Sequence, residues 1–166
     1  MLKIIRNLKD LQFQNLMEVY KESVAYNGKE FYPDLEPSLQ MLREEESFHA
    51  DLRIFFERPE AFYAINEQEG KYISALRMES YKDGLLLEAL ETAPEQRKKG
   101  LGKELVLSAL AFAKDMNYKK VYSHISRNNT PSIRLHLSCG FEKLLDHAVY
   151  IDGSVTHNAD TYMIEL

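Results

Sequence analysis

The stretch from Leu85 to Met116 reads LLLEALETAPEQRKKGLGKELVLSALAFAKDM, and the rest of the chain is organised around it. It begins as an apolar strand before Pro94, continues through a basic turn, and opens a long apolar helix with Gly100-Leu101-Gly102. The first turn of a helix has backbone N–H groups without internal partners and the positive end of the helix dipole, so it attracts anions. Glycines at 100 and 102 let a phosphate approach the backbone without a Cβ in the way. The stretch therefore predicts a turn that binds a pyrophosphate.

Basic side chains surround this turn and add positive charge to it: Arg97, Lys98, Lys99 and Lys103. Two common phosphate-binding motifs do not fit. A P-loop requires glycine at the position of Arg97 and serine or threonine at that of Glu104. A dinucleotide fingerprint requires a third glycine where Leu105 stands, which argues against nicotinamide or flavin binding.

Composition narrows the class of protein. With 166 residues, 45% of them hydrophobic, we expect one domain, residues 1–166, with a sizeable core. The net charge of −5 argues against a nucleic-acid partner, which normally requires a basic face. No run of about 18 apolar residues predicts a membrane span, and the N-terminus lacks a signal-peptide pattern. The single cysteine, Cys139, fits a reducing cytoplasm and is interpreted as a buried, unreactive thiol.

The hydrophobic periodicity predicts an alternation of strands and helices. Asn7 or Asp10 is expected to cap the first helix, and Tyr26 to Pro37 is expected to be a loop because it contains glycine and proline. Glu44, Glu45 and Glu46 are expected on the solvent face of the second helix. Strands are predicted at 2–6, 61–65, 71–78, 85–92, 119–125, 141–151 and 161–166, and helices after Asp10, at 38–56, from Gly100 to Asn117, and at 130–140.

Two motifs resemble those of a known family. Arg97, Gly100 and Gly102 form R-x-x-G-x-G between a strand and a helix, which resembles motif A of the GNAT superfamily of acetyl-CoA-dependent N-acetyltransferases. Asn129 and Gly140-Phe141 match that family's motif B, although its usual tyrosine is replaced by His136. The predicted order β-α-α-β-β-β-α-β-α-β-β is also that of the family.

The resemblance implies an α/β (α+β) fold with a mixed, mostly antiparallel sheet of about seven strands, four helices and splayed central strands. It implies acetyl-CoA as co-substrate and no metal. Pantetheine is expected to pair with the backbone of Glu91, Thr92 and Ala93, and Asn129 to reach the pantetheine or a phosphate. The pyrophosphate is expected on the turn formed by Arg97, Lys98, Lys99, Gly100, Leu101, Gly102 and Lys103. For Lys98 and Lys99 the alternative is solvated surface charge, and for Asn129 a loop role ahead of a helix cap.

The implied reaction is direct attack of an amine on the acetyl thioester, which requires a base because an ammonium group has no lone pair. His124 is the first candidate, because it occupies the register of a catalytic glutamate in some family members and titrates near neutral pH. Glu88 and Glu91 are rivals. Their spacing puts them on opposite faces of a regular strand, unless a bulge intervenes. A backbone N–H near Leu90 or Glu91 is expected to stabilise the charge on the carbonyl oxygen.

His136 is expected to donate the proton to the leaving thiolate, because of its place in motif B. An alternative is a surface histidine that merely neighbours the cofactor. We expect the acceptor to be a small-molecule amine. The alternatives are a protein N-terminus or lysine, and a non-catalytic acyl-CoA sensor. Phe31, Tyr32 and Tyr26, with the acidic residues Glu30, Asp34 and Glu36, are candidates for the acceptor side. Family members often form homodimers, so a homodimer is one expectation.

Overall fold

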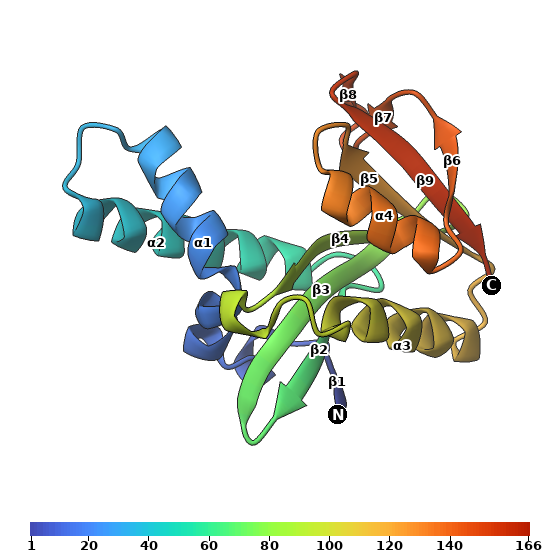
Figure 1. Ribbon diagram of the computed structural model, residues 1–166, viewed down its shortest axis with the longest axis horizontal. Helices are drawn as coiled ribbons and strands as arrows, with labels where there is room; N and C mark the ends of the chain where they lie inside the picture. Colours follow the sequence, from blue (N-terminus) through green and yellow to red (C-terminus); the bar gives the residue numbers. More distant parts are fainter.

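The computed structural model describes all of residues 1–166. A seven-stranded sheet with the order β1-β2-β3-β4-β5-β9-β6 forms its centre, and four α-helices flank this sheet (Figure 1). This is the mixed α/β architecture predicted from the sequence. The sheet strands are β1 (Leu2–Ile5), β2 (Phe62–Gln68), β3 (Lys71–Tyr81), β4 (Gly84–Thr92), β5 (Lys120–Ser126), β6 (Glu142–Leu145) and β9 (Ala159–Glu165). The α-helices are α1 (Phe13–Phe31), α2 (Pro37–Phe56), α3 (Leu101–Asp115) and α4 (Thr130–Ser138), and the 3₁₀ turns are η1 (Leu8–Asp10) and η2 (Pro94–Gln96).

The two central strands, β4 and β5, are the parallel pair in an otherwise antiparallel sheet. Their pairing covers only Leu85–Leu87 against Val121–Ser123. Beyond that register β4 continues to Thr92 and β5 to Ser126 without pairing to each other. The central strands are therefore splayed, as predicted, and unpaired backbone borders the gap between them.

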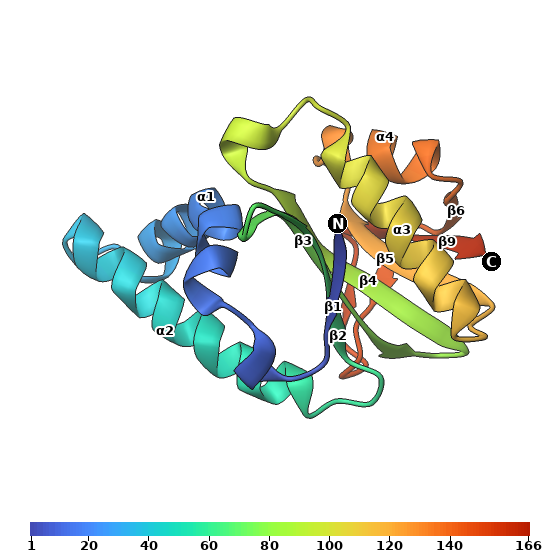
Figure 2. The ribbon, with the colours of Figure 1, turned by 90° about the horizontal axis from the view of Figure 1, so that it is seen from below.

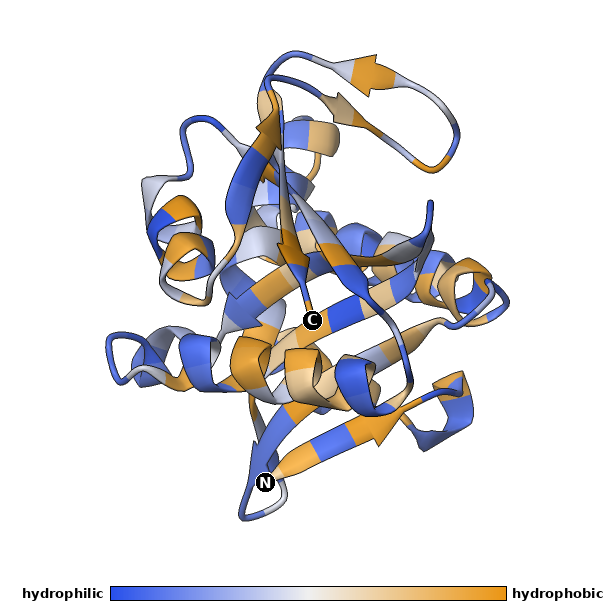
Figure 3. Cartoon of the chain, turned by 90° about the vertical axis from the view of Figure 1, so that its right-hand side faces the viewer, coloured by the Kyte–Doolittle hydropathy of each residue, from blue (hydrophilic) through white to orange (hydrophobic).

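Helices cover both faces of the sheet. In Figure 2 α1 and α2 lie on one side of the sheet, and α3 and α4 lie on the other. Leu16 of α1 and Phe55 of α2 pack with Tyr63 of β2 in one apolar core. Val106 of α3 packs with Leu87 of β4 in the other. Figure 3 shows hydrophobic residues along the central strands and hydrophilic residues on the outer turns.

The expected loop from Tyr26 to Pro37 is wrong over its first half, because α1 continues to Phe31. Gly28 lies inside this helix, and a Cβ at that position would be only 2.8 Å from the backbone oxygen of Gln40. The glycine therefore permits close contact between α1 and α2 instead of ending α1. Its helix propensity, about 1 kcal/mol poorer than that of alanine, is offset by this packing.

The first helix also begins later than predicted. Asn7 precedes the short turn η1 and makes no side-chain cap, and α1 begins only after Gln12. The expectation that Glu44 lies on the solvent face is wrong: Glu44 is buried, and the Asn27 side chain of α1 donates a hydrogen bond of 3.2 Å to its carboxylate. Glu45 and Glu46 remain at the surface.

The last predicted strands are also divided differently. The expected strand from 141 to 151 is split into β6 and β7 (Ala148–Val149). β7 pairs with β8 (Val155–Thr156) in a small separate sheet around the turn at Gly153. This hairpin brings Tyr150 back over β5, where its ring meets His124. None of the helices is long and apolar enough to cross a membrane.

Candidate functional site

A cleft of about 1160 Å³ lies where β4 leaves β5, between α1, the N-terminal end of α3 and the start of α4. Most of the predicted cofactor-binding residues line it: Glu91, Thr92, Arg97, Lys98, Gly100, Leu101, Gly102, Lys103 and Asn129. Ala93 is buried and does not line the cleft, and neither does Lys99, whose Nζ donates a hydrogen bond of 2.8 Å to Gln96 of the lining. Residues that are distant in the sequence therefore meet at one opening in the sheet.

The phosphate turn is shaped by its two glycines. Gly100 has φ +79° and precedes α3 without a side-chain cap, so no side chain occupies the amides of the first helical turn. At Gly102 a Cβ would lie 3.2 Å from Thr92 Oγ1 and 3.3 Å from Leu135 Cδ1. Both positions thus keep side-chain atoms away from the helix N-terminus, which is an anion-binding arrangement.

Arg97 is fixed at the rim of the cleft by three contacts. Its Nε donates to the Thr92 carbonyl at 3.1 Å, its Nη1 lies 2.5 Å from the Glu22 carboxylate, and its Nη2 lies 3.8 Å from Glu91. Glu22 belongs to α1, so an ion pair connects this helix to the phosphate turn. The Arg97 side chain is nevertheless 42% exposed and can reach a bound anion.

A β-bulge interrupts β4 at the cleft. Glu91 is opposite Ala75, but Glu88 is opposite Arg77, so Ala89 and Leu90 together face one residue of β3. Ala89 has φ +51°. The bulge changes the alternation expected of a regular strand and turns both glutamates toward the face that α1 and α2 cover.

Contacts on that face fix both carboxylates. Glu88 accepts a hydrogen bond of 3.3 Å from Arg77, whose guanidinium stacks 5.1 Å from the Phe55 ring of α2. Glu91 accepts a hydrogen bond from the Ser23 hydroxyl of α1. Burial raises the pKa of Glu91, and the bond from Ser23 opposes that rise. Of the two, Glu91 lines the cleft and Glu88 does not.

His124 lies on β5 one residue past the last pair with β4. Its ring meets Tyr81 at 5.3 Å and Tyr150 at 5.5 Å, both edge-on. Both ring nitrogens are buried and have no hydrogen-bond partner. Burial lowers the pKa of His124, while the Glu88 charge raises it. The imidazole is therefore neutral at pH 7 and has a free lone pair. It is not among the residues that line the cleft.

His136 is in a different environment. It is 2% exposed, on the opposite face of the sheet, with its ring 5.1 Å from Phe141. Its Nδ1 donates to the Ser132 carbonyl at 2.8 Å, and its Nε2 lies 3.2 Å from the Ser123 hydroxyl. Burial lowers the pKa of His136. This geometry gives the predicted proton-donor role no support, because both ring nitrogens lie within hydrogen-bond distance of protein groups and burial lowers the pKa of the ring.

Asn129 combines two roles. Its Oδ1 accepts a hydrogen bond of 3.2 Å from Ser132 N, so it is the N-cap of α4, one residue before the expected cap at Thr130. It also lines the cleft beside Ser132. The cap leaves the side-chain NH₂ group of Asn129 available to a ligand.

Sequence reasoning missed residues that α1 and α2 contribute to the cleft. Tyr20 and Ser23 of α1 line it together with Phe48 of α2. These residues lie far from β4 in the sequence, and no local signal points to a contact with that strand. Tyr26 also lines the cleft, but Glu30, Asp34 and Glu36 do not.

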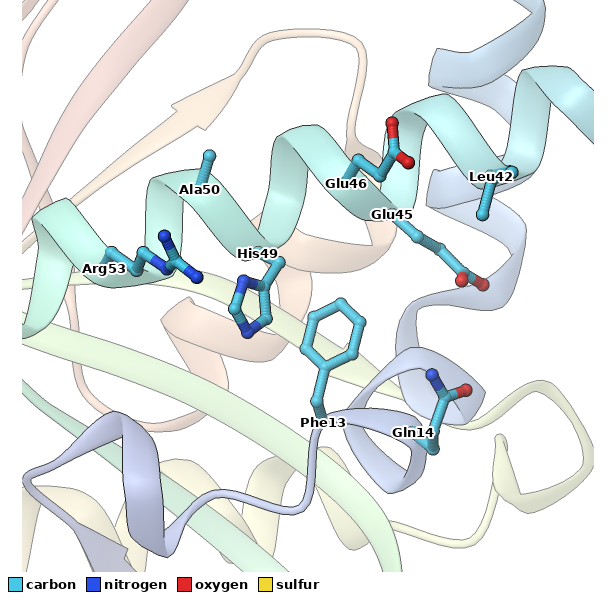
Figure 4. A pocket seen from close by; sticks show the side chains of 8 residues that line it. All are labelled: Phe13, Gln14, Leu42, Glu45, Glu46, His49, Ala50 and Arg53. Carbon is cyan, nitrogen blue, oxygen red and sulfur yellow. The ribbon is translucent and has the colours of Figure 1, made fainter.

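A second hollow, of about 390 Å³, lies outside this region. Figure 4 shows His49 and Glu45 of α2 pointing toward Phe13 and Gln14 at the start of α1. None of the predicted site residues lines it. The chain has no group of three histidine, cysteine or acidic side chains that could hold a metal. Cys139 is buried, and burial raises the pKa of its thiol, in agreement with the unreactive thiol expected.

Comparisons with known proteins agree with this fold. The family model described as "Acetyltransferase (GNAT) family" matches residues 28–141. The PaiA N-acetyltransferase of Thermoplasma acidophilum, solved with coenzyme A, is 15% identical, with a TM-score of 0.70 over 100% of this chain and 99% of that one. An acetyltransferase of Streptococcus agalactiae is 14% identical, with a TM-score of 0.67 over 99% of this chain and 98% of that one. A GNAT family acetyltransferase of Elizabethkingia anophelis with bound acetyl-CoA is 13% identical, with a TM-score of 0.58 over 70% and 82%. A search of curated proteins gave no match. At these identities, the agreement with solved structures concerns the fold.

Proposed function

The chain belongs to the GNAT family of acetyltransferases, and on that premise we propose that it acetylates the primary amine of a small molecule. Family membership makes it an acetyl-CoA-dependent acyltransferase, whereas the acceptor class and the roles of individual residues are our proposal. We also propose that residues 1–166 act as a single domain, because both apolar cores are built on the same sheet.

The observation that carries the proposal is the position of the phosphate turn at the open end of the splayed strands. We place the diphosphate of acetyl-CoA on the amides at the start of α3, with Arg97, Lys98 and Lys103 beside it. Pantetheine then runs along the backbone of β4 from Thr92 toward the bulge. This direction delivers the thioester to Ala89 and Leu90, which line the same cleft.

At the bulge, the amine attacks the acetyl carbon, the C–S bond breaks, and the electron pair leaves with sulfur. The proton of the attacking amine goes to a base. We propose His124 for this role, because burial keeps its imidazole neutral and neither nitrogen is committed to another group. Glu91 is the second candidate, since it lines the cleft and burial raises its pKa. His136 remains a candidate for the proton donor only because of its position in motif B.

The lining between α1 and β4 supports a small cationic acceptor. Tyr26 and Phe48 provide aromatic faces, and Glu91 provides a carboxylate, a combination that attracts ammonium groups. Protein N-termini and lysine side chains have the same ammonium chemistry and are the alternative acceptors. We propose the small molecule because side chains of two helices, Tyr26 of α1 and Phe48 of α2, line this part of the cleft together with β4.

The deciding experiment measures CoA thiol release from acetyl-CoA with a panel of aromatic amines, polyamines, amino sugars and lysine peptides. We expect turnover with at least one small amine and slower turnover with peptides. Faster turnover with peptides would overturn the acceptor class. Binding of CoA without turnover on any amine or peptide would favour the non-catalytic sensor.

CoA binding has its own test. Gly102→Leu should weaken CoA affinity at least about tenfold, because the new side chain fills the space beside Thr92 and Leu135. Glu104→Leu adds the same side chain at an exposed position of the same helical turn and should retain affinity within a few-fold. Calorimetry measures both. Equal affinity in Gly102→Leu and wild type would contradict the placement of the diphosphate.

A further inference from the structure

Tyr20 of α1 contacts Ala89, the residue of the β4 bulge that has a positive φ. Its side chain is buried in the core beneath α1, where its ring lies 5.3 Å from that of Phe48. Its hydroxyl donates a hydrogen bond to the backbone carbonyl of Ala89. Burial raises the pKa of Tyr20, so the hydroxyl keeps its proton and remains a donor. One side chain of α1 thus holds the carbonyl of the bulge residue.

The carbonyl direction fixes the direction of the next N–H. The peptide between Ala89 and Leu90 is trans, so its N–H points to the opposite side of the chain from its carbonyl. The carbonyl faces Tyr20, and the Leu90 N–H therefore points away from α1. Both residues line the cleft, so this peptide is exposed to a bound thioester.

The backbone conformation at Ala89 requires outside support. A residue with a side chain at φ +51° carries a cost of roughly 1–2 kcal/mol relative to the right-handed regions. A strained peptide of this kind persists only when its surroundings determine it. The hydrogen bond from Tyr20 of α1 to the Ala89 carbonyl provides such support.

We propose that Tyr20 is a positioning residue for acetyl transfer, because it orients the Ala89–Leu90 peptide so that the Leu90 N–H stabilises the acetyl oxygen. The inference rests on the proposed function and adds a residue to it. When the amine nitrogen bonds to the acetyl carbon, the C=O electron pair moves to oxygen, and it returns as the C–S bond breaks. An N–H that is already aimed at that oxygen stabilises the intermediate without reorganisation.

The test is Tyr20→Phe, which removes the hydroxyl and keeps the ring. Complete loss of an oxyanion donor lowers kcat by about 10²–10³-fold, and loosening one should cost about tenfold. Tyr72→Phe is the matched control. The Tyr72 hydroxyl accepts a hydrogen bond of 3.1 Å from the Gln12 backbone N–H just before α1, and Tyr72 does not line the cleft.

We expect Tyr20→Phe to lower kcat about tenfold with KM and Kd for CoA within twofold of wild type. We expect Tyr72→Phe to keep kcat while losing comparable stability in urea unfolding. Unchanged kcat in Tyr20→Phe, or an equal loss in Tyr72→Phe, would overturn the inference while leaving the proposed function intact. Failure of the wild-type enzyme to acetylate any amine or peptide would overturn both.

A spectroscopic signature adds a readout that a merely structural role does not move. In protein labelled with ¹⁵N-leucine, the Leu90 amide resonance should shift when acetyl-CoA replaces CoA. The shift should be smaller in Tyr20→Phe and unchanged in Tyr72→Phe. The same shift in all three proteins would show that Tyr20 does not orient this amide.

Discussion

Two histidines on opposite faces of the central strands differ in the hydrogen bonds that their ring nitrogens make. His136 is enclosed between α4 and the sheet, and both of its nitrogens are within hydrogen-bond distance of serine groups. His124 faces the other way, between Tyr81 and Tyr150, and neither of its nitrogens has a partner. Burial lowers the pKa of both rings.

The comparison shows that a lowered pKa alone does not identify a catalytic base. A neutral imidazole at pH 7 is required, and both histidines satisfy that condition. Only His124 has a lone pair that no protein group uses, and only His124 lies where the strands part. The hydrogen bonds of the ring nitrogens therefore identify His136 as a structural histidine and leave His124 as the candidate base.

The largest expected effect is on His124. His124→Ala should lower kcat about 10²-fold, because it removes the proposed proton acceptor for the amine. The measurement is steady-state thiol release at saturating acetyl-CoA with the accepted amine. His157→Ala, an exposed histidine of the last hairpin, is the control and should keep wild-type turnover. Retained turnover in His124→Ala would move the base to Glu91.

His136→Phe should lower the free energy of unfolding but leave kcat nearly unchanged. The new ring still packs against Phe141, but the Ser132 carbonyl loses the Nδ1 donor, and the Ser123 hydroxyl keeps only the Leu87 carbonyl, at a cost of about 1–3 kcal/mol. We expect kcat of the folded protein to stay within about threefold of wild type. Urea unfolding measures the loss of stability, and thiol release measures kcat. A large loss of kcat with normal stability would restore the proton-donor role.

The lowered pKa of His136 also predicts that the free energy of unfolding depends on pH. His136 has its pKa lowered in the folded state, so the unfolded chain binds the proton more readily. The stabilisation is complete above the unfolded pKa near 6.5 and is lost as the pH falls below it. His136→Phe should flatten this decline, and the part that remains includes the contribution of His124.

The parts of this molecule that the sequence could predict are those made by local backbone. The phosphate turn depends on glycines and a helix start within seven residues, Arg97 to Lys103, so its pattern is visible in one stretch. Gly28 suggests a loop in the sequence, whereas in the structure it permits close contact with Gln40 of another helix. Glycine occurs both in turns and where two backbones approach closely, and the hydrophobic periodicity of the sequence does not distinguish the two cases.

The acceptor side of the cleft could not be predicted in the same way. The bulge at Ala89 adds one residue to β4 and reverses the face of everything after it, which alternation alone cannot reveal. Tyr20 and Ser23 reach β4 across some seventy residues of sequence. The sequence likewise could not separate His124 from His136, because the difference lies in Tyr81, Tyr150 and the two serines around them.

The smallest expected effect concerns Glu88, whose charge raises the pKa of His124 against the effect of burial. Glu88→Gln should move the acid limb of the kcat/KM profile to lower pH, because the neutral form of His124 then persists further into acid. Glu142→Gln removes an equal charge from exposed β6 and should leave the limb in place. The pH profiles of both variants with one amine measure the difference. If Glu88→Gln instead lowered kcat as much as His124→Ala at every pH, Glu88 would itself take the proton. The contrast between the two histidines would then no longer locate the base, because a carboxylate already bonded to Arg77 would have replaced a ring with two free nitrogens.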